Sequence, residues 1–196
     1  RSGCGKSTLV ALLMGFYRAQ QGKILFNQQE INHIERHSFY RHVCLVSHSS
    51  YVFKGSLREN MQMAAANVTD DVIYAALEQV NLANFVRQNG GLDMPLLSRG
   101  TNLSGGQIQR LALARALLHD AKLYIFDEAT SNIDVESEEI ILQFIKRLKA
   151  TKTIVMISHR LANAVLADRI YVLEKGTLIE TGNHHSLMER NGSYAE

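Results

Sequence analysis

Apolar and polar residues follow two different periods along this chain, and together they predict helices separated by short strands. Apolar-rich or amphipathic runs predict helices at 8–17, 70–82, 104–118 and 136–149. Compact apolar runs predict strands at 22–26, 42–47, 123–126 and 153–158. The Lys175-Gly176 pair predicts a hairpin turn between strands at 170–173 and 177–179.

The order of these elements predicts the fold class. Strands alternate with helices in the first and last thirds of the chain, which is typical of an α/β core with a mostly parallel sheet. The middle third, about 56–118, has no convincing strand and predicts a helical subdomain. Its helix at 70–82 continues towards Arg87 and ends at the Asn89-Gly90-Gly91 break. We therefore expect one domain over 1–196 that includes this subdomain.

Composition narrows the function classes. Hydrophobic residues make up 46% of the 196 residues, which is enough to form a core. The net charge is +2, and the basic residues are scattered along the chain. A dedicated nucleic-acid binder usually concentrates its basic residues on one face, so no nucleic-acid partner is expected. The two cysteines form no CxxC pair, which fits a reducing compartment. Neither a signal peptide nor an apolar run of about 20 residues is seen, so a membrane role would need another domain or chain.

The first residues carry the back half of a phosphate-binding loop, GxxxxGK[ST]. Its backbone N–H groups and the following helix N-terminus suit phosphate oxygens. Lys6 is placed to neutralise the β- and γ-phosphates of a nucleotide, and the Ser7 hydroxyl to bind Mg²⁺. The chain begins inside the motif, which predicts a fragment of a longer polypeptide. The predicted nucleotide-binding residues here are Ser2, Gly3, Cys4, Gly5, Lys6, Ser7 and Thr8.

Two acidic residues follow the apolar run at 123–126. A buried strand would deliver Asp127 to the sheet edge, where it can hold Mg²⁺ through water. Glu128 would then lie beside the γ-phosphate and could act as a general base on the attacking water. The alternative is a strand that ends in a solvated acidic turn, which the phosphate loop makes the weaker interpretation.

The segment Leu103-Ser104-Gly105-Gly106-Gln107 resembles the hallmark LSGGQ of ABC transporter nucleotide-binding domains, and the resemblance covers the whole chain. It implies a P-loop NTPase core whose helical subdomain carries LSGGQ. It also implies a head-to-tail dimer in which each LSGGQ segment caps the ATP of the partner. The implied nucleotide contacts in this segment are Ser104, Gly105, Gly106 and Gln107.

Two further segments resemble loops of the same family. The stretch 131–134 resembles the D-loop, which implies a role for Asp134 across the dimer. The stretch 158–161 resembles the H-loop, which implies that His159 contacts the γ-phosphate and orients the water that Glu128 activates. Catalysis would therefore rest on Glu128 and His159, and metal binding on Ser7 and Asp127.

Softer similarities favour an exporter. They lie at 127–131, at 53–60 and in the tail from 167 onward. In exporters the 53–60 stretch meets the membrane domain, so the resemblance implies a transmembrane partner and a place on the cytoplasmic face of the cell membrane. It does not separate cysteine/glutathione exporters from lipid, drug or peptide exporters.

The chain departs from the family pattern at several positions. His48 stands where the family has the Q-loop Gln, and an imidazole nitrogen suits Mg²⁺ less well than an amide oxygen. We expect either weaker metal engagement or altered coupling, with a tolerated substitution as an equal alternative. Ser98 replaces an acidic residue of a run that contacts the membrane domain, and Ser186 replaces a Glu.

Two other function classes stay open. One is an ABC-type ATPase that acts on DNA or ribosomes, against which the short interval between phosphate loop and LSGGQ argues. The other is a non-catalytic, regulatory half of a heterodimer, which His48 keeps possible although Lys6, Ser104, Glu128 and His159 are intact. Outside these motifs, His33 and His37 are interpreted as a surface pair and His184-His185 as tail or turn.

Overall fold

The computed structural model describes residues 4–131 and 133–195. They fall into two compact units. The central unit is Arg36–Val155, and the terminal unit combines the described residues up to Glu35 with those from Met156 onward. The predicted helical subdomain at about 56–118 lies within the sequence of the central unit, and its boundaries stay a prediction.

The central sheet supplies the framework of the central unit. Strands β3 (Val43–Ser47) and β6 (Leu123–Asp127) pair in parallel, with Val43 opposite Leu123 and Ser47 opposite Asp127. Strand β7 (Thr153–Ile157) completes the order β3-β6-β7. The side chains of Tyr124, Ile125 and Phe126 are all buried, as expected of a parallel strand that is covered on both faces. The predicted α/β class with a parallel sheet is confirmed.

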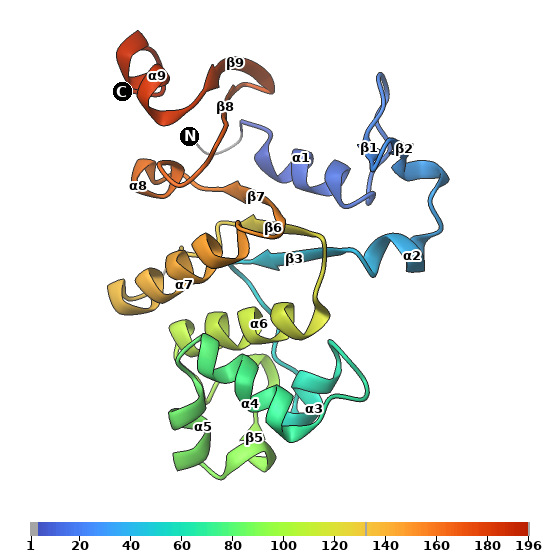
Figure 1. The fold of residues 1–196 in the computed structure, drawn as a ribbon, viewed down its shortest axis with the longest axis vertical. Coiled ribbons are helices and arrows are strands. Elements are labelled where there is room, and N and C mark those ends of the chain that lie inside the picture. The colour runs from blue at the N-terminus through green and yellow to red at the C-terminus, as the bar shows by residue number, and fades with distance from the viewer. Residues whose placement is uncertain (1–3, 132, 196) are drawn as a thin grey trace. The chain divides into compact units, whose positions relative to one another are not determined.

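Helices α6 (Gly105–His119) and α7 (Val135–Leu148) accompany this sheet (Figure 1). Helix α6 packs against β3 and α7. Helix α7 buries Ile141, Phe144 and Ile145 on one side, which is the amphipathic stripe that its sequence predicts. Both helices begin within one residue of their predicted starts, because Ser104 and Asp134 cap them.

The rest of the central unit is mostly helical but differs in detail from the expectation. Its further elements are α2 (Arg36–Tyr40), α3 (Leu57–Gln62), α4 (Asp70–Gln79), α5 (Ala83–Gln88) and the 3₁₀ turns η2 (Gly91–Asp93) and η3 (Ser98–Gly100). The predicted continuous helix towards Arg87 is wrong, since Asn81 adopts a φ of 53° and separates α4 from α5. The expectation of no strand is also wrong, because β4 (Gly55–Ser56) pairs with β5 (Pro95–Leu96). Two-residue strands are too short to show an alternating pattern.

The terminal unit contains one longer helix and two hairpins. Its elements are α1 (Lys6–Leu13), β1 (Leu25–Phe26), β2 (Gln29–Glu30), η1 (Ile31–His33), α8 (Leu161–Ala164), β8 (Ile170–Glu174), β9 (Thr177–Gly182) and α9 (His184–Arg190). The predicted β8–β9 hairpin is confirmed. Helix α1 ends before the predicted Tyr17, because Gly15 turns to a φ of 68°.

The last helix corrects one interpretation. Of the two interpretations of His184 and His185, tail or turn, the turn is wrong, because both residues belong to α9. Asn183 caps this helix by accepting a hydrogen bond from the Ser186 N–H at 2.9 Å, and the Ser186 hydroxyl accepts one from the Asn183 N–H at 3.1 Å. Ser186, a departure from the family pattern, therefore serves as a reciprocal cap. No helix in the described part of the chain is both long and apolar enough to cross a bilayer.

Candidate functional site

The described part of the phosphate loop turns sharply into α1. Gly5 caps this helix with a φ of 100°, a value that glycine adopts without strain, and its carbonyl accepts from the Leu9 N–H at 2.9 Å. The hairpin turn at Gly176 contacts the phosphate loop, because the Gly176 N–H donates to the Cys4 carbonyl at 3.1 Å. Lys6 follows at the first helical position, with its Nζ 3.5 Å from Cys4 Sγ.

The remaining predicted loop residues divide into two sets. Ser7 and Thr8 lie exposed on the first turn of α1, where a phosphate could reach their hydroxyl groups. Ser2 and Gly3 lie outside the described residues. Cys4 and Cys44 are both free cysteines, and Cys4 is buried.

A second candidate position in the terminal unit follows β7. The Ser158 hydroxyl accepts from the Arg160 N–H at 3.0 Å and from Asn163 Nδ2 at 3.4 Å. These bonds hold a tight turn between β7 and α8 and leave the His159 side chain exposed. The turn therefore presents an imidazole to solvent directly after a strand, as the proposed contact with a γ-phosphate requires.

The parallel pairing of β3 and β6 brings three predicted site residues of the central unit to one edge. Ser47 and Asp127 are opposite each other at the carboxyl ends of the strands. The His48 N–H donates to the Asp127 carbonyl at 3.0 Å, so His48 lies beside the peptide that leads into Glu128. Glu128 adopts a φ of 51°, in the left-handed region. Backbone strain of this kind clusters at functional sites and persists only where surrounding contacts hold it.

Asp127 suits Mg²⁺ by the chemistry of its donor atoms. Magnesium in nucleotide sites is usually bound by one or two protein oxygen ligands together with phosphate oxygens and water. Among residues 4–131 and 133–195, no group of three or more His, Cys, Asp and Glu side chains is arranged as a metal cluster. An Asp127 carboxylate at the strand end fits the phosphate-bound type of site, whereas the His48 nitrogen fits it poorly.

His48 is expected to alter the Mg²⁺ dependence of ATP hydrolysis. Replacing it by Gln would supply an amide oxygen at the exposed position beside Asp127, so His48→Gln should lower the Mg²⁺ concentration needed for half-maximal rate. The measurement is the rate of phosphate release across a magnesium titration in both proteins. Superimposable curves would show that the substitution is tolerated.

The LSGGQ segment forms the amino-terminal end of α6 through a reciprocal cap. The Ser104 hydroxyl accepts from the Gln107 N–H at 3.2 Å, and Gln107 Oε1 accepts from the Ser104 N–H at 2.8 Å. This capping box fixes both side chains. The cap does not use the N–H groups of Gly105 and Gly106 at the start of the helix. These groups have no intrahelical acceptor, so they suit an anion.

Asp134 caps the next helix and lies close to the LSGGQ segment. Its carboxylate accepts from the Ser137 N–H and from the Ser137 hydroxyl, each at 2.8 Å. These hydrogen bonds lower the pKa of Asp134. A Cβ on the buried Gly106 would press on Ser137 Oγ and lie 2.8 Å from Asp134 Oδ2. The proposed D-loop and the LSGGQ segment are therefore packed together within one chain.

Gln109 was not predicted as a functional residue. It is only 2% exposed, and its Nε2 donates to the carbonyls of Ser47 and Ala129, both at 2.9 Å. A sequence signal was available, because Gln109 shares a helix face with the buried residues Leu113 and Ala116. A polar residue within an apolar stripe indicates a buried hydrogen-bonding role.

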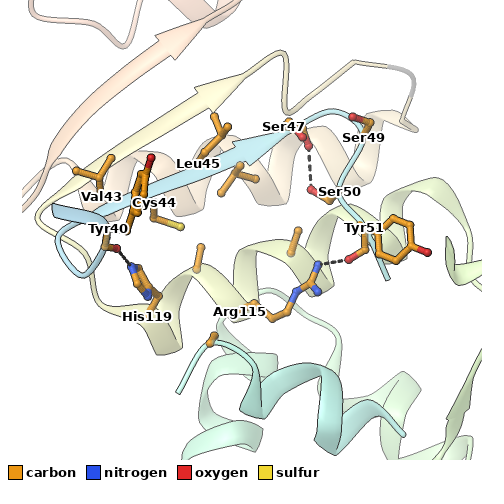
Figure 2. Close-up of a pocket in the computed structure, with 14 residues that line it drawn as sticks. Tyr40, Val43, Cys44, Leu45, Ser47, Ser49, Ser50, Tyr51, Arg115 and His119 are labelled. Carbon is orange, nitrogen blue, oxygen red and sulfur yellow. Dashed lines mark hydrogen bonds between the residues drawn. The ribbon is translucent and has the colours of Figure 1, made fainter. Parts of the chain in front are cut away.

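A cavity of about 490 Å³ opens in the central unit between β3 and α6. Arg115 borders it and donates from Nη2 to the Tyr51 carbonyl at 2.7 Å, while His119 contacts the Tyr40 carbonyl at 2.9 Å (Figure 2). Burial raises the pKa of the Cys44 thiol to about 11, so this cysteine stays protonated at neutral pH. Burial also lowers the pKa of Arg115. The cavity thus combines apolar side chains, among them Val43, Val46 and Ala112, with the guanidinium of Arg115.

Comparisons with known proteins agree with these features. The family model described as ABC transporter matches residues 1–131. An uncharacterized ABC transporter ATP-binding protein of Haemophilus influenzae is 76% identical over 196 residues, which are 100% of this chain and 35% of that protein. An ATP-dependent lipid A-core flippase of Saccharophagus degradans is 39% identical over 195 residues, 99% of this chain and 33% of the flippase.

A solved structure gives the same answer at the level of the fold. A bacterial Atm1-family ABC exporter with ATP bound matches with a TM-score of 0.93 and 34% sequence identity. The match covers 100% of this chain and 34% of the exporter chain. This chain therefore spans about a third of the length of the relatives that it matches.

Proposed function

We propose that this chain, which belongs to the ABC transporter family, drives export across a membrane by ATP-dependent dimerisation. It is an ATP-binding domain of the exporter type, and domains of this class are ATPases. The observation that carries the proposal is the meeting of Asp127, Glu128 and His48 at one end of the parallel β3–β6 pair. This is the strand-end position at which nucleotides bind in open α/β sheets. The transported substrate is left open.

The phosphate loop binds the nucleotide in this proposal. Backbone N–H groups around Gly5 and at the start of α1 donate hydrogen bonds to the phosphate oxygens, and Lys6 neutralises the β- and γ-phosphates. Ser7 and Asp127 would hold Mg²⁺, which, when bound, neutralises charge that develops on the phosphates. Ser2, Gly3, Cys4 and Thr8 complete the loop.

Hydrolysis then depends on two side chains. Glu128 accepts a proton from water as the water attacks the γ-phosphate in line, and His159 contacts the γ-phosphate and orients that water. The left-handed backbone of Glu128 supports its role, since an unfavourable conformation is retained where function needs the side chain in one direction.

The LSGGQ segment acts on the nucleotide of a second domain. Ser104, Gly105, Gly106 and Gln107 form a capped helix start with N–H groups available to a γ-phosphate. Two such domains arranged head to tail would place ATP between the phosphate loop of one and this segment of the other. Asp134 is packed against Gly106. In the dimer it would couple the closing of one ATP site to the other.

The transmembrane partner is proposed to dock at the cavity beside α6, on the cytoplasmic face of the membrane. Tyr51 and Phe53 are 47% and 45% exposed, and their rings pack edge to face with centroids 4.8 Å apart. Exposed aromatic side chains beside a cavity are typical of an interface anchor. Tyr51 also accepts the Arg115 hydrogen bond, so the docking surface is tied to α6.

A regulatory half of a heterodimer is the second candidate function. The observation in its favour is His48 beside Asp127, because the imidazole replaces an oxygen donor. Such a half would bind ATP without hydrolysing it at its own site.

Complementation between two variants tests the proposal. Lys6→Ala disables the phosphate loop, and Ser104→Arg disables the LSGGQ segment. In a head-to-tail dimer of the two variants, one site would retain Lys6 from one chain and Ser104 from the other. We expect that neither variant hydrolyses ATP alone and that mixing them restores phosphate release, in chains extended upstream to complete the phosphate loop. A mixture as inactive as its components would contradict the shared site.

A further inference from the structure

The turn that carries Glu128 is held by a series of three hydrogen bonds to consecutive carbonyl groups. The Asp127 carbonyl accepts from the His48 N–H at 3.0 Å, and the Glu128 carbonyl accepts from the Ser131 N–H at 2.9 Å. The Ala129 carbonyl accepts from Gln109 Nε2 at 2.9 Å. Two of these donors are backbone groups, so Gln109 is the donor whose chemistry a substitution can remove.

The Gln109 amide can be oriented in only one way. Both of its partners, the Ser47 and Ala129 carbonyls, are acceptors, so the amide nitrogen and not the oxygen must face them. Each N–H of the amide then serves one carbonyl. With the side chain 2% exposed, water cannot readily replace these donors. The Ser47 carbonyl also accepts from the Ser50 hydroxyl at 2.9 Å, so loss of the amide is most costly at the buried Ala129 carbonyl.

The two carbonyls belong to segments with proposed roles at the reaction centre. Ser47 is the last residue of β3 and immediately precedes His48. Ala129 immediately follows Glu128. Gln109 itself lies on α6, the helix that begins at the LSGGQ segment. One amide thus joins the LSGGQ helix to the residue beside His48 and to the residue beside Glu128.

We propose that Gln109 is a positioning residue for ATP hydrolysis, which holds the Glu128 turn and the start of the His48 loop in a fixed relation to the LSGGQ helix. This inference rests on the proposed function of Glu128 as the general base. Its physical basis is the left-handed φ of 51° at Glu128, which the surrounding bonds must maintain. Without the amide, the turn can relax and Glu128 loses its direction.

The test uses Gln109→Met in the intact protein that carries this chain. Methionine has a similar length and can fill the same space, but it cannot donate to either carbonyl. We expect kcat to fall by about 10- to 100-fold, the scale of a 1 Å misplacement, with the KM for ATP within about twofold. Gln143→Met is the matched control, because Gln143 is an exposed glutamine on α7.

A second background separates positioning from general damage. If Gln109 acts through Glu128, then Gln109→Met should cause no further loss in a Glu128→Gln protein, measured in single turnover and corrected for ATP-binding stoichiometry. An equal loss in both backgrounds would overturn the inference, as would an unchanged kcat. If the Met variant does not fold, Gln109→Asn, whose amide is one methylene too short, is judged by the same criteria. Full activity of Glu128→Gln itself would instead overturn the proposed function.

Discussion

Glu128→Gln is expected to slow ATP hydrolysis by about 10²- to 10⁴-fold, the usual contribution of a general base, while ATP binding is retained. Glutamine keeps the size of the side chain and can still hydrogen-bond to water, but it cannot accept the proton. The substitution leaves in place the main-chain groups and the Gln109 amide that hydrogen-bond around the turn, so these bonds should persist.

The measurement combines two readouts on one preparation. Phosphate release in single turnover reports the chemical step, and the stoichiometry of bound ATP reports the folded, binding-competent fraction. Glu139→Gln is the control, since Glu139 is an exposed glutamate on α7. A hydrolysis rate within about threefold of the parent would mean that another group accepts the proton, and the proposed mechanism would then be wrong.

The parts of the site that were predictable are those in which one short segment carries both the structure and the chemistry. The apolar run before Asp127 and Glu128 predicts where these two residues lie, because a buried strand must deliver the residues at its end to the sheet edge. The LSGGQ segment is similar, since Ser104 and Gln107 form a capping box within four residues. Their catalytic and binding roles stay predictions.

The parts that escaped prediction depend on residues far apart in the sequence. Gln109 reaches carbonyls that are 62 and 20 positions away, and no local pattern specifies such partners. The close packing of Gly106 on Ser137 joins two helices in the same way. The short β4–β5 pair is continued by a hydrogen bond from the Leu57 N–H to the Met94 carbonyl. These contacts join segments that come together only in the folded chain, so no local pattern predicts them.

Gly106→Ala is expected to destabilise the chain although alanine favours helices. Alanine gains about 1 kcal/mol over glycine inside a helix, but overpacking a buried contact costs about 1–3 kcal/mol. The added Cβ would press on Ser137 Oγ, lie 2.9 Å from Ser137 Cβ and lie 2.8 Å from Asp134 Oδ2. Because the backbone at the start of α7 fixes Ser137 Cβ, rotation of the side-chain oxygens alone cannot relieve the clash.

Two independent measurements check this expectation. In denaturant unfolding, the free energy of unfolding should fall by up to about 2 kcal/mol for Gly106→Ala, and by more for Gly106→Val, which adds two methyl groups beyond the Cβ. Gly105→Ala serves as the stability comparison, because Gly105 is the exposed neighbour on the same helix turn. A stabilised Gly106→Ala would show that α6 and α7 can separate at no cost.

A second substitution locates the clash. Ser137→Gly removes both the Oγ and the Cβ that the new methyl group meets, so it should harm the parent but recover part of the stability lost in Gly106→Ala. Hydrolysis should follow the same order, since the contact joins the LSGGQ segment to Asp134, and both are proposed to face the partner domain. If the two substitutions simply add in stability and in rate, then Gly106 and Ser137 act independently, and the packing between them does not couple the LSGGQ segment to the proposed D-loop.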